Sequence, residues 1–147
     1  MTAFLDASAL VKLYVPEHGA SVVAALEEPF VVSGLSRVEV ASGLWRKHRD
    51  GWIELDEAAV LLAAFDADWN GSSTEPARFV AVPVNACVLE AATRQLAWHP
   101  VRTGDSVQLA SAAAARAVDP HVSSFVTFDA RLAAAAAAEG FDVVGAG

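Results

Sequence analysis

The sequence predicts an α/β protein of three layers (α/β/α), in which helices cover both faces of a central, mainly parallel sheet. Short apolar, β-branched stretches alternate with helical patterns along all 147 residues. The helical stretches have the length of right-handed crossovers between parallel strands. No internal repeat or change of composition divides the chain, so we expect a single domain over residues 1–147.

Each expected strand is a short apolar run that ends at a turn residue or an acid. TAFLDA contains Asp6 directly after the apolar residues, and FVVSG ends at Gly34. The expected strands cover residues 2–7, 30–34, 78–84, 121–128 and 141–146.

The expected helices follow from apolar residues at helical spacing and from stops at proline or glycine. The first is stopped by Pro16, and SRVEVASGLWRKHRDG ends at Gly51. NGSSTEPA, residues 70–77, is the clearest loop. The expected helices cover residues 7–15, 18–28, 36–51, 56–69, 85–98, 103–118 and 129–140.

The composition narrows the class of protein. No stretch is apolar for the ~20 residues of a membrane span, and the first residues lack the pattern of a signal peptide. The single cysteine, Cys87, fits a reducing compartment, so we expect a cytoplasmic protein without membrane contact. A net charge of −8 argues against nucleic-acid binding by bulk electrostatics alone. A hydrophobic content of 54% suggests that some surface is buried against a partner.

Four acids lie where expected strands end or expected helices begin: Asp6, Glu39, Asp105 and Asp129. Taken singly, each is most simply a helix cap. Asp6 and Asp129 suit N-caps, Ser36 and Glu39 have the spacing of a capping box, and Asp105 suits a helix dipole.

Taken together, the acids indicate a metal site. Ligands of open parallel sheets bind beyond the carboxyl ends of the strands, where all four acids are expected. Carboxylates gathered there would repel one another unless a cation neutralised them. Oxygen ligands favour Mg²⁺, or Mn²⁺, over zinc.

Four segments in this order resemble the motifs of PIN-domain proteins, most closely the VapC-type toxins of bacterial toxin–antitoxin pairs. They are FLDASALVKLY, SRVEVASGLWR, TGDSVQLASAAAA and FVTFDARLAAAAAAEGF. The resemblance covers nearly the whole chain, and no acidic position of the family pattern is missing.

The resemblance implies a metal-dependent endoribonuclease that a cognate VapB-type antitoxin holds inactive. Asp6 and Asp105 would be direct metal ligands, Glu39 a ligand or the group that orients the attacking water, and Asp129 would act directly or through water. Ser8 and Thr127 would supply hydroxyls that position carboxylates. Small proteins of this kind usually form homodimers, and the apolar content fits a dimer interface or an antitoxin groove.

Three basic side chains lie near the expected crevice in sequence, and three tryptophans lie among apolar helix positions. Lys12, Arg37 and Arg102 are the candidates for contacts with RNA phosphates. The cluster of Arg46, Lys47 and Arg49 is interpreted as a solvated helix end. Trp45, Trp52 and Trp98 are expected in the core or an interface.

Two other interpretations stay open: a catalytically silent PIN-like interaction module, and a DNase or structure-specific nuclease. Other acid-bearing α/β folds fit worse. Asp6 stands alone rather than beside a second acid as in receiver domains, and position 8 is serine where dehalogenase-type phosphatases carry aspartate. The sequence has neither a G-x-G-x-x-G fingerprint nor a P-loop.

Overall fold

The computed structural model describes residues 1–146, so Gly147, the last residue of the expected domain, lies outside the described part. Its centre is a five-stranded sheet of order β3-β2-β1-β4-β5 in which every neighbouring pair is parallel. The strands are β1 (Thr2–Leu5), β2 (Phe30–Ser33), β3 (Phe79–Val82), β4 (Val122–Val126) and β5 (Asp142–Val144). The predicted fold class and parallel sheet are confirmed.

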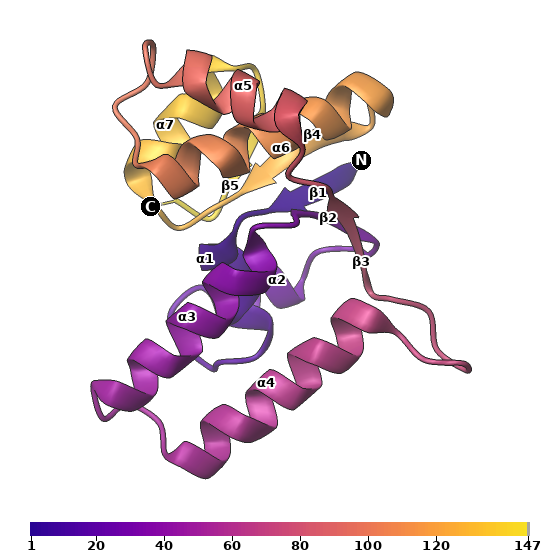
Figure 1. Cartoon of the computed structure of the whole chain (residues 1–147), viewed down its shortest axis with the longest axis vertical. Helices are drawn as coiled ribbons and strands as arrows, with labels where there is room; N and C mark the ends of the chain where they lie inside the picture. The colour runs from indigo at the N-terminus through magenta and orange to yellow at the C-terminus, as the bar shows by residue number, and fades with distance from the viewer. Residues whose placement is uncertain (147) are drawn as a thin grey trace.

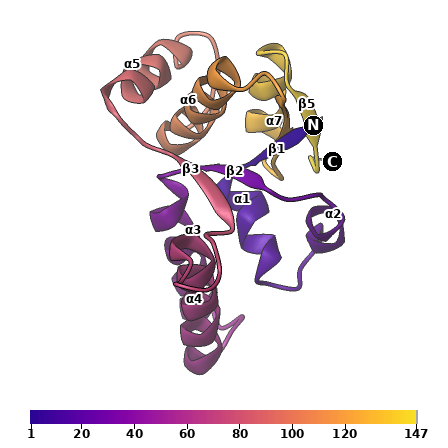
Figure 2. The same ribbon diagram turned by 90° about the vertical axis from the view of Figure 1, so that its right-hand side faces the viewer.

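Helices cover both faces of this sheet (Figures 1 and 2). The helical elements are α1 (Ala7–Leu10), the 3₁₀ turn η1 (Val11–Leu13), α2 (Ala20–Ala24), α3 (Ser36–Arg49), α4 (Leu55–Asn70), α5 (Ala86–Gln95), α6 (Thr103–Val118) and α7 (Ala130–Ala138). Figure 2 shows α5, α6 and α7 on one side of the sheet and α1 to α4 on the other, and Figure 1 shows α3 and α4 extending away as an antiparallel pair. None of the helices within residues 1–146 combines the length and apolarity needed to cross a membrane.

The central strand β1 separates two hydrophobic cores because successive side chains of a strand point to opposite faces. Leu5 packs with α1, α3 and α4, in the core that contains Phe65. Phe4 faces the other way and stacks on Phe125, with ring centroids 5.3 Å apart, in the core that includes Leu109 of α6. Both faces of β1 are therefore buried, as parallel sheets require.

The helix expected over residues 18–28 is shorter in the structure, where α2 ends at Ala24. Pro29 accounts for part of the difference, because the residue before a proline is disfavoured in helical conformation. The chain instead turns through Glu28, whose carboxylate pairs with Arg78 at 2.7 Å, into β2.

The strand order places a crevice beside β1. The connection that leaves β1 runs toward β2, whereas β4, on the other side of β1, is reached only after β3. Loops from β1 and β4 therefore diverge at the carboxyl edge of the sheet, which is where ligands of open α/β sheets bind.

Candidate functional site

Asp6 lies at the carboxyl end of β1 and caps α1. Its Oδ1 accepts hydrogen bonds from the Ala9 backbone N–H (2.9 Å) and the Ser8 hydroxyl (2.7 Å). Its Oδ2 accepts one from the Thr127 hydroxyl at 2.6 Å. The residue is only 3% exposed. Burial raises the pKa of Asp6 to about 6, although all three hydrogen bonds oppose that rise.

Ser8 and Thr127 connect the ends of β1 and β4. The Thr127 hydroxyl, besides donating to Asp6, accepts a hydrogen bond from the Asp129 backbone N–H at 3.1 Å. The Ser8 hydroxyl accepts one from the Phe128 N–H at 3.0 Å. These bonds fix the β4–α7 turn against Asp6, so the two hydroxyls lie where they can position the carboxylates.

Asp129 and Asp105 are joined by one arginine. Asp129 caps α7 through Oδ1, which accepts from the Leu132 N–H at 2.9 Å. Its Oδ2 lies 3.1 Å from a terminal guanidinium nitrogen of Arg102. Asp105 Oδ2 lies 3.3 Å from Arg102 Nε. The Arg102 guanidinium therefore bridges the two carboxylates in this structure.

Glu39 is not the end of a capping box. Helix α3 begins after Leu35, whose N–H donates to the Ser33 hydroxyl. The Ser36 hydroxyl instead accepts from the Gln108 amide at 3.0 Å. Glu39 Oε1 is buried without a hydrogen-bond partner within residues 1–146. Burial, and then the nearby Asp105 charge, raise the pKa of Glu39 against the opposing effect of the Gln108 amide.

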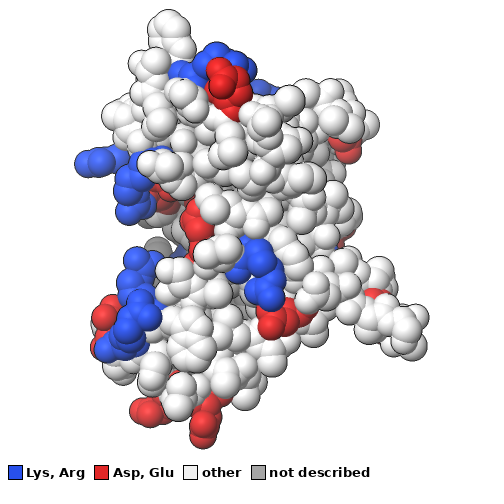
Figure 3. All heavy atoms as spheres, in the orientation of Figure 1, with Lys and Arg blue, Asp and Glu red and all other residues white. Residues whose placement is uncertain are grey.

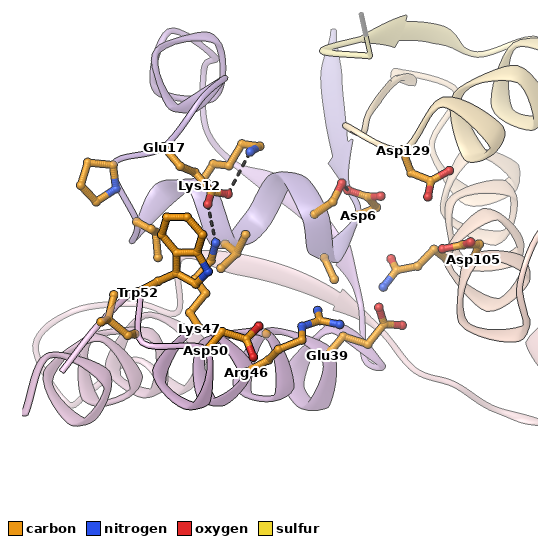
Figure 4. Close-up of a pocket in the computed structure, with 18 of the residues that line it drawn as sticks. Asp6, Lys12, Glu17, Glu39, Arg46, Lys47, Asp50, Trp52, Asp105 and Asp129 are labelled. Atoms are coloured by element: carbon orange, nitrogen blue, oxygen red, sulfur yellow. Dashed lines mark hydrogen bonds and ion pairs between the residues drawn. The ribbon is translucent and has the colours of Figure 1, made fainter. Parts of the chain in front are cut away.

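All four acids line one cavity of about 850 Å³. In Figure 4, Asp6, Glu39, Asp105 and Asp129 come from different elements and surround its inner end. Figure 3 shows acidic atoms inside a hollow between the upper and lower parts of the molecule, with basic side chains along its border. The acids predicted from four distant sequence positions thus share one cavity.

The basic side chains are placed differently from expectation. Lys12 and Arg102 line the cavity, but Arg37 does not. Arg37 lies on the side of α3 that faces α4, where it pairs with Asp66 at 2.6 Å. Arg46 and Lys47, interpreted from the sequence as a solvated helix end, lie in the last turn of α3, and both also line the cavity.

Trp52 also lines the cavity and is 80% exposed, so a core position is wrong for this residue. The separation of these residues from the four acids in sequence gave no indication that they line the same cavity. Helix α3 runs along the cavity wall, so its last turn lies at the far end of the cavity (Figure 4).

The donor chemistry of the inner end fits a divalent cation. Within residues 1–146, no three Asp, Glu, His or Cys side chains lie close enough together in this conformation to bind one metal ion. The buried, unpartnered Glu39 Oε1 and the buried Asp6 carboxylate are nevertheless costly groups that a hard cation would stabilise. Arg102 supplies positive charge between the other two acids.

A parallel α/β sheet with an acidic cavity at its carboxyl edge defines the class of this protein. The PIN domain family model matches residues 3–138, and the chain belongs to the PIN-domain family. No curated protein matches the sequence.

The fold is shared with solved structures of toxins. VapC20 of Mycobacterium tuberculosis, described as a sarcin–ricin-loop-cleaving toxin, matches with a TM-score of 0.61 and 21% identity over 95% of each chain. FitAcB from Neisseria gonorrhoeae matches with a TM-score of 0.59 and 16% identity over 96% of this chain and 95% of that chain. A toxin–antitoxin complex from Klebsiella pneumoniae matches with a TM-score of 0.56 and 16% identity over 86% of each chain.

Proposed function

We propose that this PIN-domain protein is a divalent-metal-dependent endoribonuclease, a VapC-type toxin that hydrolyses RNA phosphodiester bonds. The observation that carries the proposal is that Asp6, Glu39, Asp105 and Asp129 line one cavity at the carboxyl edge of the sheet. Acidic side chains, rather than basic ones, are the ligands that metal-assisted phosphodiester hydrolysis requires.

Each acid has a role in the proposal. Asp6 and Asp105 hold Mg²⁺, or Mn²⁺, and Asp129 joins them directly or through water. A cation held by these acids would supply activation of the attacking water and compensation for the charge that develops on the phosphate. Glu39 would either bind the same cation or orient the water; its buried Oε1 has no hydrogen-bond partner among the described residues.

The surrounding side chains keep this arrangement in place. The hydroxyls of Ser8 and Thr127 donate to Asp6 and favour its ionised form against the effect of burial. Arg102, which is 75% exposed, exchanges its carboxylate partners for a phosphate of the RNA.

The proposal includes a cognate VapB-type antitoxin and a homodimer in the cytoplasm. Several large apolar side chains on α3 and α4 are exposed, which gives surface for both kinds of contact. They include Val38, Leu55 and Val60, exposed by 66%, 55% and 67%. We expect the antitoxin-free chain to migrate as a dimer in size-exclusion chromatography with light scattering.

A mixed structured RNA pool tests the activity. The purified, antitoxin-free chain is incubated with Mg²⁺ or Mn²⁺ and, separately, with EDTA. Asp6→Asn and Asp105→Asn are compared with Asp142→Asn, an exposed acid of β5 outside the cavity, after circular dichroism has shown that all three fold. Cleavage that needs metal, stops in the first two variants and persists in the third supports the proposal.

A silent interaction module is the second candidate, because Arg102 already offsets part of the charge of Asp105 and Asp129 without a metal ion. A folded wild-type chain that binds no Mg²⁺ or Mn²⁺ and cuts neither RNA nor DNA would establish that module. Cleavage confined to single-stranded or branched DNA in parallel assays would identify a DNase or structure-specific nuclease instead.

A further inference from the structure

The cavity continues beyond the four acids toward the end of α3 and the turn into α4 (Figure 4). Four side chains that no acid-based function requires line this outer end: Lys12, Arg46, Lys47 and Trp52. An aromatic ring and several cations therefore share one wall with the candidate metal site.

Trp52 is held by its backbone rather than by packing. Helix α3 ends in a Schellman motif, in which the Gly51 N–H donates to the His48 carbonyl (3.0 Å) and the Trp52 N–H donates to the Lys47 carbonyl (2.9 Å). The motif needs the left-handed conformation of Gly51, whose φ is +81°. The motif fixes the backbone from which the indole, 80% exposed, reaches the cavity wall.

The charges at the outer end are suited to individual phosphate contacts. Arg46 is exposed and forms no ion pair within the described part of the chain. In Figure 4 its side chain extends along the cavity toward Glu39. Lys12 and Lys47 share a single carboxylate, that of Glu17, so one positive charge of this group is uncompensated.

Two further acids, Asp50 and Glu57, also line the outer end. The surface is therefore not a broad basic patch, in agreement with the net charge of −8. An extended polyanion would not be attracted by bulk charge here, and recognition has to come from the ring and from single cations.

We propose that the outer end of the cavity is a nucleotide-binding subsite for single-stranded RNA. A base stacks on Trp52, and Arg46 contacts the phosphate between that base and the nucleotide at the acids. The inference rests on the proposed ribonuclease function. Stacking on an exposed aromatic ring beside an arginine is how proteins bind unpaired bases with little sequence preference.

An RNA strand fits this subsite better than an antitoxin peptide. The ring and Arg46 lie in the same cavity as the acids, so a strand whose phosphate reaches the acids can extend along them. A peptide helix would instead need a continuous apolar face, which the charged side chains of this wall interrupt.

The test measures binding separately from cleavage. A fluorescein-labelled random decaribonucleotide is titrated by anisotropy in EDTA, because the proposed cleavage needs a metal ion, and its length is checked afterwards. Trp52→Ala is compared with Trp52→Phe and with Trp98→Ala, which removes an indole that is 79% exposed outside the cavity. Arg46→Gln is compared with Arg49→Gln, on the same helix but not in the cavity wall.

We expect Trp52→Ala to weaken binding about 5-fold to 100-fold, Trp52→Phe to weaken it less, and Trp98→Ala to leave it unchanged. Arg46→Gln should weaken binding and lower its salt dependence, whereas Arg49→Gln should do neither. With an oligonucleotide of abasic sugars, wild type and Trp52→Ala should bind equally, because no base is present to stack.

Equal affinity of wild type and Trp52→Ala for the intact RNA would show that the proposed subsite is wrong. So would an equal loss in Trp98→Ala, or a Trp52 effect that persists with abasic RNA. A protein partner would then be the remaining candidate for contact with this wall. A failure of the proposed function would give a different result: the wild-type protein itself would bind no metal ion and would not cleave RNA.

Discussion

The Thr127 hydroxyl donates a 2.6 Å hydrogen bond to Asp6 Oδ2 and joins the ends of β4 and β1 across 121 positions of sequence. The same hydroxyl accepts from the Asp129 N–H, so one side chain locates two of the four acids. Both partners are buried, so the bond is shielded from water. Small changes at Thr127 should therefore act on the site as well as on the stability of the fold.

We expect Thr127→Val, which keeps the shape and removes the hydroxyl, to weaken Mg²⁺ binding and RNA cleavage about 10-fold to 100-fold, as is typical when a group that orients a metal ligand is lost. The free energy of unfolding should fall by about 1–3 kcal/mol, because the Asp6 carboxylate and the Asp129 N–H each lose a partner. Calorimetric Mg²⁺ titration, cleavage rates and urea unfolding measure these effects. Thr127→Ser retains the hydroxyl and should restore most of the activity; failure of this rescue would show that the methyl group, not the hydroxyl, matters.

Asp6 should make the metal-free protein less stable as pH rises. Its pKa is about 6 in the folded state against 3.8 for the ordinary side chain, so the folded state binds more protons between these values. The stabilisation is full below about pH 4 and is lost as pH rises through 6. The difference between the two pKa values corresponds to a loss of roughly 3 kcal/mol in the free energy of unfolding between low and neutral pH.

Asp6→Asn should therefore gain stability relative to wild type as pH increases from 4 to 7 in EDTA, measured by urea unfolding. Added Mg²⁺ should stabilise wild type but not the variant, because the ion binds the folded state only through the acids. A difference between the two proteins that is constant from pH 4 to 7 would contradict the raised pKa.

The order and type of the elements could be predicted because apolar periodicity is local. The expected helix over residues 103–118 has the same bounds as α6, and each expected strand is present. The predicted bounds were wrong where tertiary contacts decide them. Helix α2 ends at Ala24, and in place of its expected last turn the chain brings Glu28 to Arg78.

The acids of the site could be anticipated because strand ends in a parallel sheet converge at one edge. The positions of Arg46, Lys47 and Trp52 on the cavity wall could not, because they depend on the direction in which α3 leaves the sheet. Gly51 was recognisable as a helix stop, but the sequence does not show that the resulting Schellman motif turns Trp52 into the cavity.

Gly104 allows α6 to approach Glu39 closely. A Cβ atom at Gly104 would lie 3.0 Å from Glu39 Oε1, which is too close for an undisturbed contact. Gly104→Ala should therefore displace the Glu39 carboxylate and slow RNA cleavage about 10-fold. Stability should be unchanged or rise by up to about 1 kcal/mol, because alanine favours helix.

Gly43→Ala is the control for helix propensity, because Gly43 lies in α3 on the cavity wall and a Cβ there meets no atom within 4 Å. It should gain similar stability in thermal unfolding while Mg²⁺ binding stays at the wild-type level. If Gly104→Ala binds Mg²⁺ and cleaves RNA like wild type, the position of Glu39 is not required for activity.

Arg102 should oppose metal binding and support RNA binding. Its guanidinium offsets the charges of Asp105 and Asp129, so Arg102→Gln leaves the acids more negative and should tighten Mg²⁺ binding several-fold. RNA cleavage at limiting substrate should fall about 10-fold, because a phosphate contact is lost. The free energy of unfolding should change by less than about 1 kcal/mol, since the Arg102 side chain in these ion pairs is exposed to solvent.

Tighter Mg²⁺ binding together with slower RNA cleavage would distinguish Arg102 from an ordinary surface charge. Arg37→Gln removes an arginine whose pairing with Asp66 lies outside the cavity, and it should alter neither Mg²⁺ binding nor cleavage. Calorimetry at fixed ionic strength and initial cleavage rates between 50 and 200 mM salt measure both quantities. If Arg102→Gln weakened Mg²⁺ binding, the arginine would be a structural support of the acids; if it left cleavage intact, the proposed phosphate contact would be wrong.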